Sequence, residues 1–282
     1  MPGVRDGGTI LGAPVQHLPD LLAQLVGYFQ EITMDHAAGL TGGGERFPHT
    51  RYSVVEAVGS PDAGVRERAF DTLIRAYWKP VYYRLRIQWN ATADDAKDLT
   101  QEFFLRAMSQ GFFDRYDRGR AKFRTFLRTC LDRFVANERK AAGRLKRGGG
   151  VTIVALDFDD AERFLQGRTS AADPDRMFHD EWVRSVFNLA VERLRVECEE
   201  SGKDQAFQLF LRYDIDAAGG DSVTYRDLAD RFDLPVTQVT NLLALARGRF
   251  REQVLSCLRE LSGSEEEFRD DAAALLGVRD HA

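Results

Sequence analysis

The chain has 282 residues, of which 44% are hydrophobic, and it carries a formal net charge of −5. This length predicts one to three compact units, and the apolar content suits packed cores rather than a disordered chain. Because the sequence has neither a run of eighteen apolar residues nor a secretory signal, we expect no membrane-spanning segment and a cytoplasmic protein.

Charge is distributed unevenly along the chain. Residues 61–150 contain 20 Lys or Arg against 11 Asp or Glu, whereas residues 151–221 contain 8 against 16. The basic segment predicts a polyanionic partner, with the acidic segment kept away from it or held against it in the idle protein. Cys130, Cys198 and Cys257 are widely spaced in helical apolar patterns, which favours buried thiols over disulfides or a zinc site.

The first part of the chain leads into a helical block. Residues 1–46 are Gly-rich at both ends and are expected to be a flexible, non-essential extension, with Met34 as a possible natural start. Apolar residues then repeat with helical period from Ala69 to Tyr77. Pro80 is expected to end this helix and start another that continues to Trp89.

The next predicted helix begins at Thr92, which can cap it through the residue three positions later, and ends at Gly111. Its core face on a helical wheel consists of Ala96, Leu99, Phe103 and Ala107. An adjoining polar stripe, either a solvated face or a surface for a partner, consists of Asp95, Asp98, Gln101, Glu102 and Arg106.

A long helix is predicted from Lys122 to Arg144. The stretch from Arg115 to Arg147 has 12 basic residues against 4 acidic ones, counting Asp114 at its edge, and aromatic residues lie between them. Basic side chains can follow a phosphate backbone while aromatic faces stack on bases, so this composition is typical of single-strand binding. Because Phe126, Leu127, Cys130, Leu131 and Phe134 keep helical period and are expected in the core, the candidates for phosphate contacts are Arg120, Lys122, Arg124 and Arg128.

Two segments that follow resemble ligand loops only superficially. Residues 146–150 (KRGGG) lack the Gly-Lys-Ser/Thr ending of a nucleotide loop, and we interpret them as a helix stop and linker. The acidic residues from Asp157 to Glu162 lack the spacing of a calcium loop, and we expect a solvated connector. A long helix follows from Pro174 to Gly202, then a shorter one around Phe207 to Arg212 and a loop over 214–221.

Residues 225–251 carry a helix-turn-helix signature followed by basic residues. Ala229 is small enough for two helices to cross, Asp233 tolerates the left-handed turn position, and Pro235 suits the first turn of the second helix. Gln238, Thr240 and Asn241 are expected to reach base edges, and the arginines to contact phosphates. The full set of candidate duplex-binding residues is Thr237, Gln238, Thr240, Asn241, Ala244, Arg247, Arg249 and Arg251.

Residues 263–282 are acidic and weakly patterned, and we expect a tail without a defined role. The five histidines are scattered, with no pair at metal-ligand spacing and no nucleophile motif beside them. The sequence therefore favours a protein without catalytic activity, cofactor or metal.

Taken together, these parts resemble the extracytoplasmic-function group of the sigma-70 family, the sigma factors of bacterial RNA polymerase. The resemblance covers about residues 50 to 260. The family's D-A-E-D-L-x-Q-E-x-F-x-R pattern corresponds to residues 95–106, DAKDLTQEFFLR, in which Lys97 replaces an acid. The usual Trp and Asn of the family's promoter-melting helix correspond to Phe126 and Arg133, and Leu242 and Leu245 stand where the family often has basic residues in the recognition helix.

The resemblance implies an all-α fold with two helical domains joined by a flexible acidic linker. A domain like sigma region 2, over 47–147, would bind core polymerase through the polar stripe and the minus-ten strand through the basic helix. A linker would cover 148–175, a region 4-like domain over 176–262 would read the minus-thirty-five element, and a tail would follow.

The expected partners are core RNA polymerase and promoter DNA, with an anti-sigma factor or a Ser/Thr kinase as further possibilities. Two alternatives remain open at this point. The first is a stand-alone helix-turn-helix regulator, which would need no surface for polymerase. The second is a nucleotide-dependent enzyme that uses the KRGGG segment and the acidic connector.

Overall fold

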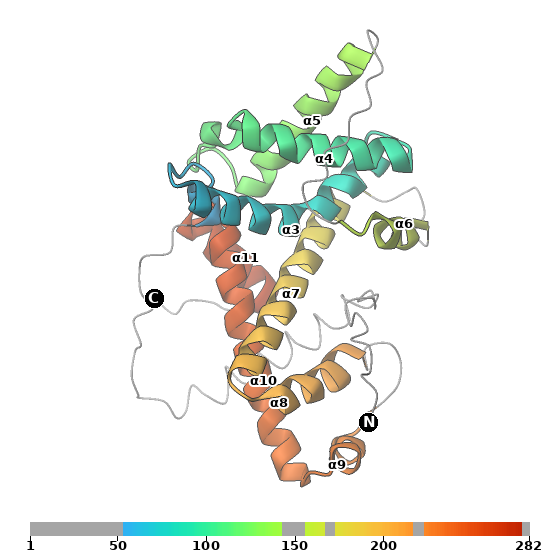
Figure 1. The fold of residues 1–282 in the computed structure, drawn as a ribbon, viewed down its shortest axis with the longest axis vertical. Coiled ribbons are helices and arrows are strands. Elements are labelled where there is room, and N and C mark those ends of the chain that lie inside the picture. The colour runs from blue at the N-terminus through green and yellow to red at the C-terminus, as the bar shows by residue number, and fades with distance from the viewer. Residues whose placement is uncertain (1–52, 143–155, 167–172, 217–222, 278–282) are drawn as a thin grey trace, which may run out of the picture.

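The computed structural model describes residues 53–142, 156–166, 173–216 and 223–277 (Figure 1). Within these residues the chain is all helical and has no strands, as the sequence predicts. The elements are α2 (Val54–Ala57), α3 (Ala63–Ile87), α4 (Ala93–Ser109), the 3-10 turn η2 (Phe112–Arg115), α5 (Phe123–Ala142), α6 (Phe158–Gln166), α7 (Pro174–Glu200), α8 (Asp204–Phe210), the π-helical turn η3 (Leu211–Asp216), α9 (Tyr225–Phe232), α10 (Val236–Leu261) and α11 (Glu265–Leu276).

The helices form an elongated molecule with two ends. Helices α3, α4 and α5 gather at one end, α8 and α9 lie at the other, and the long helices α7 and α10 run between them (Figure 1). Helix α7 packs on α3, where the rings of Phe178 and Tyr77 lie 6.5 Å apart, and on α10, where those of Phe187 and Phe250 lie 5.8 Å apart. In the described parts of the chain, no helix combines the length and apolar character needed to cross a bilayer.

The main hydrophobic core is continuous from one end of the molecule towards the other. It contains buried residues from α2 through α8 and from α10 and α11, while a second, smaller cluster lies within the helix-turn-helix. The expected division into two helical domains is therefore not confirmed. The apolar face of α7 is long enough to pack on α3 at one end of the molecule and on α8 and α10 towards the other. Amino-acid composition alone does not reveal this.

Buried charge also connects the elements. The guanidinium of Arg84 on α3 is only 7% exposed and donates to Asp132 of α5 at 2.8 Å and to Asp175 of α7 at 2.6 Å. Trp89 Nε1 donates to the same Asp132 carboxylate at 2.9 Å. Because removing one partner of a buried ion pair is costly, this group fixes the position of α5 and α7 on α3.

Pro80 lies inside one continuous helix, α3, so the expected restart of the helix at this residue is wrong. A proline in a helix interior removes one backbone hydrogen bond and costs about 3 kcal/mol. Fully buried side chains flank Pro80 on both sides, with Tyr77 before it and Val81 after it. The packing of these residues outweighs the local penalty.

The acidic connector is not a solvated segment throughout. Residues 158–166 form α6, whose Phe158 ring packs edge-on against Trp78 and Tyr82 at 5.3 Å. Asp160 pairs with Lys79 at 3.1 Å, and Glu162 pairs with Arg86 at 2.6 Å. The prediction of a solvated, flexible connector is thus wrong for this part, because its acids meet the basic side chains of α3. The extension 1–46 and the KRGGG segment lie outside the described residues.

Residues 265–276 form a packed helix rather than a weakly patterned tail. Phe268, Ala272 and Leu276 of α11 are buried against the main core. The expectation of buried thiols holds for Cys198 and Cys257, and burial raises the pKa of Cys257 to about 12. Cys130, by contrast, is half-buried.

Candidate nucleic-acid interface

The helix-turn-helix is built by local hydrogen bonds. Thr224 caps α9 in a reciprocal arrangement, in which its hydroxyl accepts from Asp227 N and the Asp227 carboxylate accepts from Thr224 N. The helix ends at Asp233, whose backbone is left-handed with φ 52° and ψ 52°. Pro235 directly precedes α10, one residue earlier than expected. These features reproduce the predicted turn.

The predicted reader face points to solvent. Leu228, Ala229, Val239 and Leu243 form the small inner cluster with Leu209. The residues between them on α10 are exposed: Thr237, Gln238, Thr240, Asn241 and Ala244. Side chains able to address base edges therefore stand on the outer face of the second helix, which is the face that enters a major groove in this motif.

The arginines that follow do not form the predicted set of phosphate contacts. Arg247 is 6% exposed, and its guanidinium donates to the Asp214 carboxylate at 2.8 to 3.1 Å and to Tyr225 Oη at 3.3 Å. Burial alone would lower the pKa of Arg247, but the hydrogen bonds to Asp214 raise it. Arg249 pairs with Glu197 of α7, and Arg251 is half-buried. Arg247 is thus a structural residue, because its helical position faces η3 and Tyr225 of α9 rather than solvent.

Sequence reasoning missed three exposed residues beside the reader face. Arg226 and Arg231 are exposed on α9, the helix that crosses the DNA backbone in this motif. Val236 is 41% exposed at the start of α10, where an apolar side chain can contact a thymine methyl group. Because the first helix of this motif crosses the DNA backbone, basic residues on α9 could have been identified from the sequence as candidate phosphate contacts.

The four predicted strand-binding residues have carboxylate partners. Arg120 is 85% exposed and lies 3.1 Å from Asp117 in its own loop. Arg128 lies 3.2 Å from Asp175. Lys122 and Arg124 pair with carboxylates of α11, and the Arg124 guanidinium, which is 13% exposed, also stacks 3.9 Å from the centre of the Trp182 ring. All four residues are thus paired within the protein in this conformation, and Arg120 alone among them stays largely exposed.

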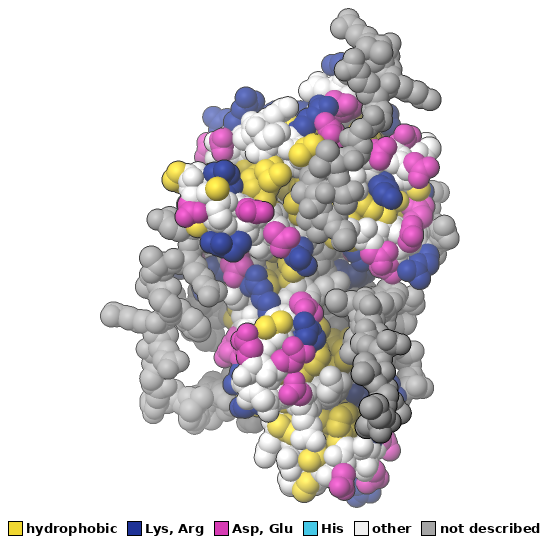
Figure 2. Space-filling view, in the orientation of Figure 1, with side chains coloured by type: hydrophobic (Ala, Val, Ile, Leu, Met, Phe, Trp, Pro, Cys, Tyr) yellow, Lys and Arg dark blue, Asp and Glu magenta, His cyan; other side chains and the backbone are white. Residues whose placement is uncertain are grey.

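The outer face of α5 carries a different set of residues. Thr125, Thr129, Arg133 and Asn137 are exposed, and the Phe126 ring is half-buried against Tyr116 and Phe123. On the face of the molecule in Figure 2, Lys and Arg side chains alternate with Asp and Glu side chains rather than forming one basic field. The excess of positive charge in the sequence is therefore partly compensated by neighbouring acids in the fold.

The polar stripe on α4 is accessible. Thr92 caps the helix, as predicted, by accepting from Asp95 N at 3.1 Å, and Asp98 is exposed on the stripe. Gln101, Glu102 and Arg106 are half-exposed, and Arg106 is held between Glu102 and Glu138 at 2.6 Å each. The core face differs from the predicted one, since Thr100 and Phe104 are buried and Leu99 is only half-buried. The amine of Lys97, outside the stripe, lies 5.7 Å from the centre of the Phe158 ring of α6.

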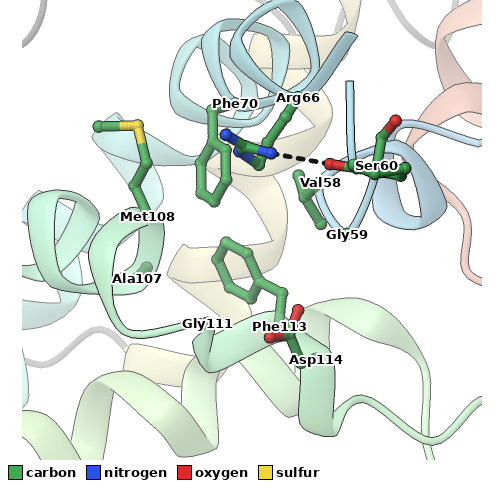
Figure 3. A pocket seen from close by; sticks show the side chains of 11 residues that line it. Val58, Gly59, Ser60, Arg66, Phe70, Ala107, Met108, Gly111, Phe113 and Asp114 are labelled. Atoms are coloured by element: carbon green, nitrogen blue, oxygen red, sulfur yellow. Dashed lines mark hydrogen bonds between the residues drawn. The ribbon is translucent and has the colours of Figure 1, made fainter. Parts of the chain in front are cut away.

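A pocket of about 360 Å³ lies between α2, the start of α3 and the turn after α4. Phe70 and Phe113 approach each other across it, and Arg66 donates to the Ser60 carbonyl at its rim (Figure 3). It does not bring a nucleophile and a base together. Among the described residues, no cluster of His, Cys, Asp or Glu suits a metal ion.

Comparisons of the chain with protein-family models, curated proteins and solved structures gave no match.

Proposed function

We propose that this protein is a promoter-specificity subunit of bacterial RNA polymerase, similar to the extracytoplasmic-function sigma factors. In this proposal it binds core polymerase, reads the minus-thirty-five element as duplex and holds the minus-ten strand once that strand is open. It acts in the cytoplasm and performs no chemistry of its own. An anti-sigma factor or a kinase would be a further regulatory partner.

The observation that carries the proposal is the exposed reader face next to a correctly formed turn. Gln238, Thr240 and Asn241 are accessible on a helix whose inner face is completely buried. Asn can bond adenine in two-point fashion, and each lost base contact costs about 1 to 3 kcal/mol of discrimination. Arg226 and Arg231 are suitably exposed for the phosphates on either side.

The finer architecture belongs to the same proposal. Helices α2 to α5, within residues 47–147, would correspond to sigma region 2, and α7 to α10, within residues 176–262, to region 4, with residues 148–175 linking the two. The polar stripe of α4 would contact a basic helix of the polymerase through Asp95, Asp98, Gln101, Glu102 and Arg106. The exposure of Asp98 supports this assignment.

Charge reversal on the stripe tests the proposal. Asp98→Lys with Glu102→Lys should abolish co-purification with core polymerase, because opposite charges across an interface would become like charges. Glu67→Lys with Glu200→Lys is a matched control, since both glutamates are exposed on other helices and the total charge changes equally. Both double variants should melt within a few degrees of the wild type.

The alternative is a stand-alone helix-turn-helix regulator. The pairing of Glu102 and Arg106 with each other and with Glu138 favours it, because a stripe satisfied within the protein needs no partner. If the stripe variant binds polymerase as the wild type does, this alternative becomes the better account. Mapping of transcript starts with the reconstituted polymerase would then complete the distinction.

A further inference from the structure

Helix α11 covers the start of α5. Glu267 of α11 places both carboxylate oxygens 3.1 Å from the backbone N of Phe123, the first residue of α5, and one of them also accepts from Gly263 N at 2.9 Å. The first N–H groups of a helix have no partner within the helix and form a positive end that favours anions. Glu267 therefore occupies the place where an external anion would bind.

The basic side chains at this helix end are occupied as well. Lys122 Nζ lies 2.9 Å from Asp270 and 3.4 Å from Asp271. Arg124 donates to both oxygens of Asp271, one of them at 2.9 Å. The side chains of Glu267 and Asp271 are only 3% and 6% exposed. Three carboxylates, those of Glu267, Asp270 and Asp271, thus lie against one helix end and two cations, as the phosphates of a nucleic-acid strand would.

The contact is anchored by apolar packing on the other side of α11. Phe268 is buried, and the Arg259 guanidinium of α10 lies 4.1 Å from the centre of its ring. Only Ser262, Gly263 and Ser264 separate α10 from α11, so α11 is attached directly to the helix that carries the reader face. Moving α11 away from α5 would break this packing of Phe268, so the packing opposes the movement.

We propose that α11 is an autoinhibitory clasp, which fills the strand-binding site of α5 with its own carboxylates until single-stranded DNA displaces it. This inference rests on the proposed function and adds regulation to the same site. Glu267, Asp270 and Asp271 occupy the positions of phosphates, so the strand and α11 exclude each other. The free protein is therefore held in a form with low affinity for single strands.

The test measures the affinity of the full chain for a labelled single-stranded DNA oligonucleotide. Asp270→Asn with Asp271→Asn removes two clasp charges and should tighten binding by about fivefold or more, the lower range of coupling between competing ligands. Glu265→Gln with Glu266→Gln removes two charges from exposed positions of the same helix and is the matched control. It should bind nearly as the wild type does.

Asp271 is buried, so the double variant could unfold the clasp end. Asp270→Asn alone is the safeguard, because that carboxylate is 58% exposed and its loss leaves Asp271 in place. Hydrogen exchange gives a second readout. Amides of residues 265–276 should exchange faster when the oligonucleotide binds the wild-type protein, since displacement of α11 exposes them.

The possible outcomes separate the clasp from the proposed function. Equal affinities for wild type, clasp variants and control, with unchanged exchange in α11, would overturn the clasp and leave strand binding intact. If none of the variants binds the oligonucleotide, strand binding by α5 is wrong, and the clasp is wrong with it. Tighter binding by the clasp variants alone supports both.

Discussion

At the scale of single residues, the arginines around the reader helix have two different roles. Arg247 is buried with Asp214, whereas Arg231 is exposed on α9. A basic residue after a reader helix predicts a phosphate contact, but this interpretation ignores which face of the helix the residue occupies. Position along the chain does not reveal that Asp214, 33 residues away, is the partner.

This difference gives a prediction about stability and binding. Arg247→Ala should lower the free energy of unfolding by about 3 to 5 kcal/mol, because it leaves the Asp214 carboxylate buried without its partner. Arg231→Ala should leave stability unchanged and weaken binding to all duplex sequences alike. The slope of the logarithm of the binding constant against the logarithm of the salt concentration should become shallower by about 0.9, the value for one lost phosphate contact. Thermal melting and duplex titrations at several salt concentrations measure both effects. A stable Arg247→Ala protein with weakened duplex binding would restore the original interpretation.

At the scale of helices, local residue patterns predict where a helix begins and ends better than they predict which other helices it packs against. The cap at Thr92 and the turn at Asp233 follow from residue types within a few positions, and both are confirmed. The continuity of α3 through Pro80 and the packing of α6 and α11 depend on tertiary contacts. Arg124 and Asp271, for example, are 147 residues apart, so no local pattern indicates their pairing.

The turn at Asp233 is suitable for a matched pair of substitutions. A non-glycine residue in the left-handed region carries strain of about 1 to 2 kcal/mol, which Asp and Asn tolerate better than other residues. Asp233→Ala should therefore lower the melting temperature and weaken duplex binding, whereas Asp233→Gly should preserve both. Equal behaviour of the two variants would show that this backbone geometry is not what holds α9 and α10 together.

At the scale of the whole molecule, the continuous core limits what the protein can reach. Helix α10 has 26 residues and, at about 1.5 Å per residue, is about 39 Å long, with the reader face near its first turns and the clasp following its last. Two promoter elements 25 base pairs apart are separated by about 85 Å of duplex. If the proposed function is correct, the protein cannot contact both elements in this conformation, and α7 and α10 would have to lose part of their packing on the α3 end when polymerase binds.

The required opening can be measured by energy transfer between two dyes. Asp94 on α4 and Asp230 on α9 are exposed and belong to helices at opposite ends, so each can be replaced by Cys and labelled, with Cys130 replaced by Ser to avoid labelling there. Addition of core polymerase should lower the transfer efficiency, because the ends move apart to span the promoter. The stripe variant Asp98→Lys with Glu102→Lys should keep the efficiency of the free protein at the same polymerase concentration. An unchanged distance in a complex that initiates transcription would mean that one end alone contacts the promoter, as a stand-alone reader of duplex DNA does.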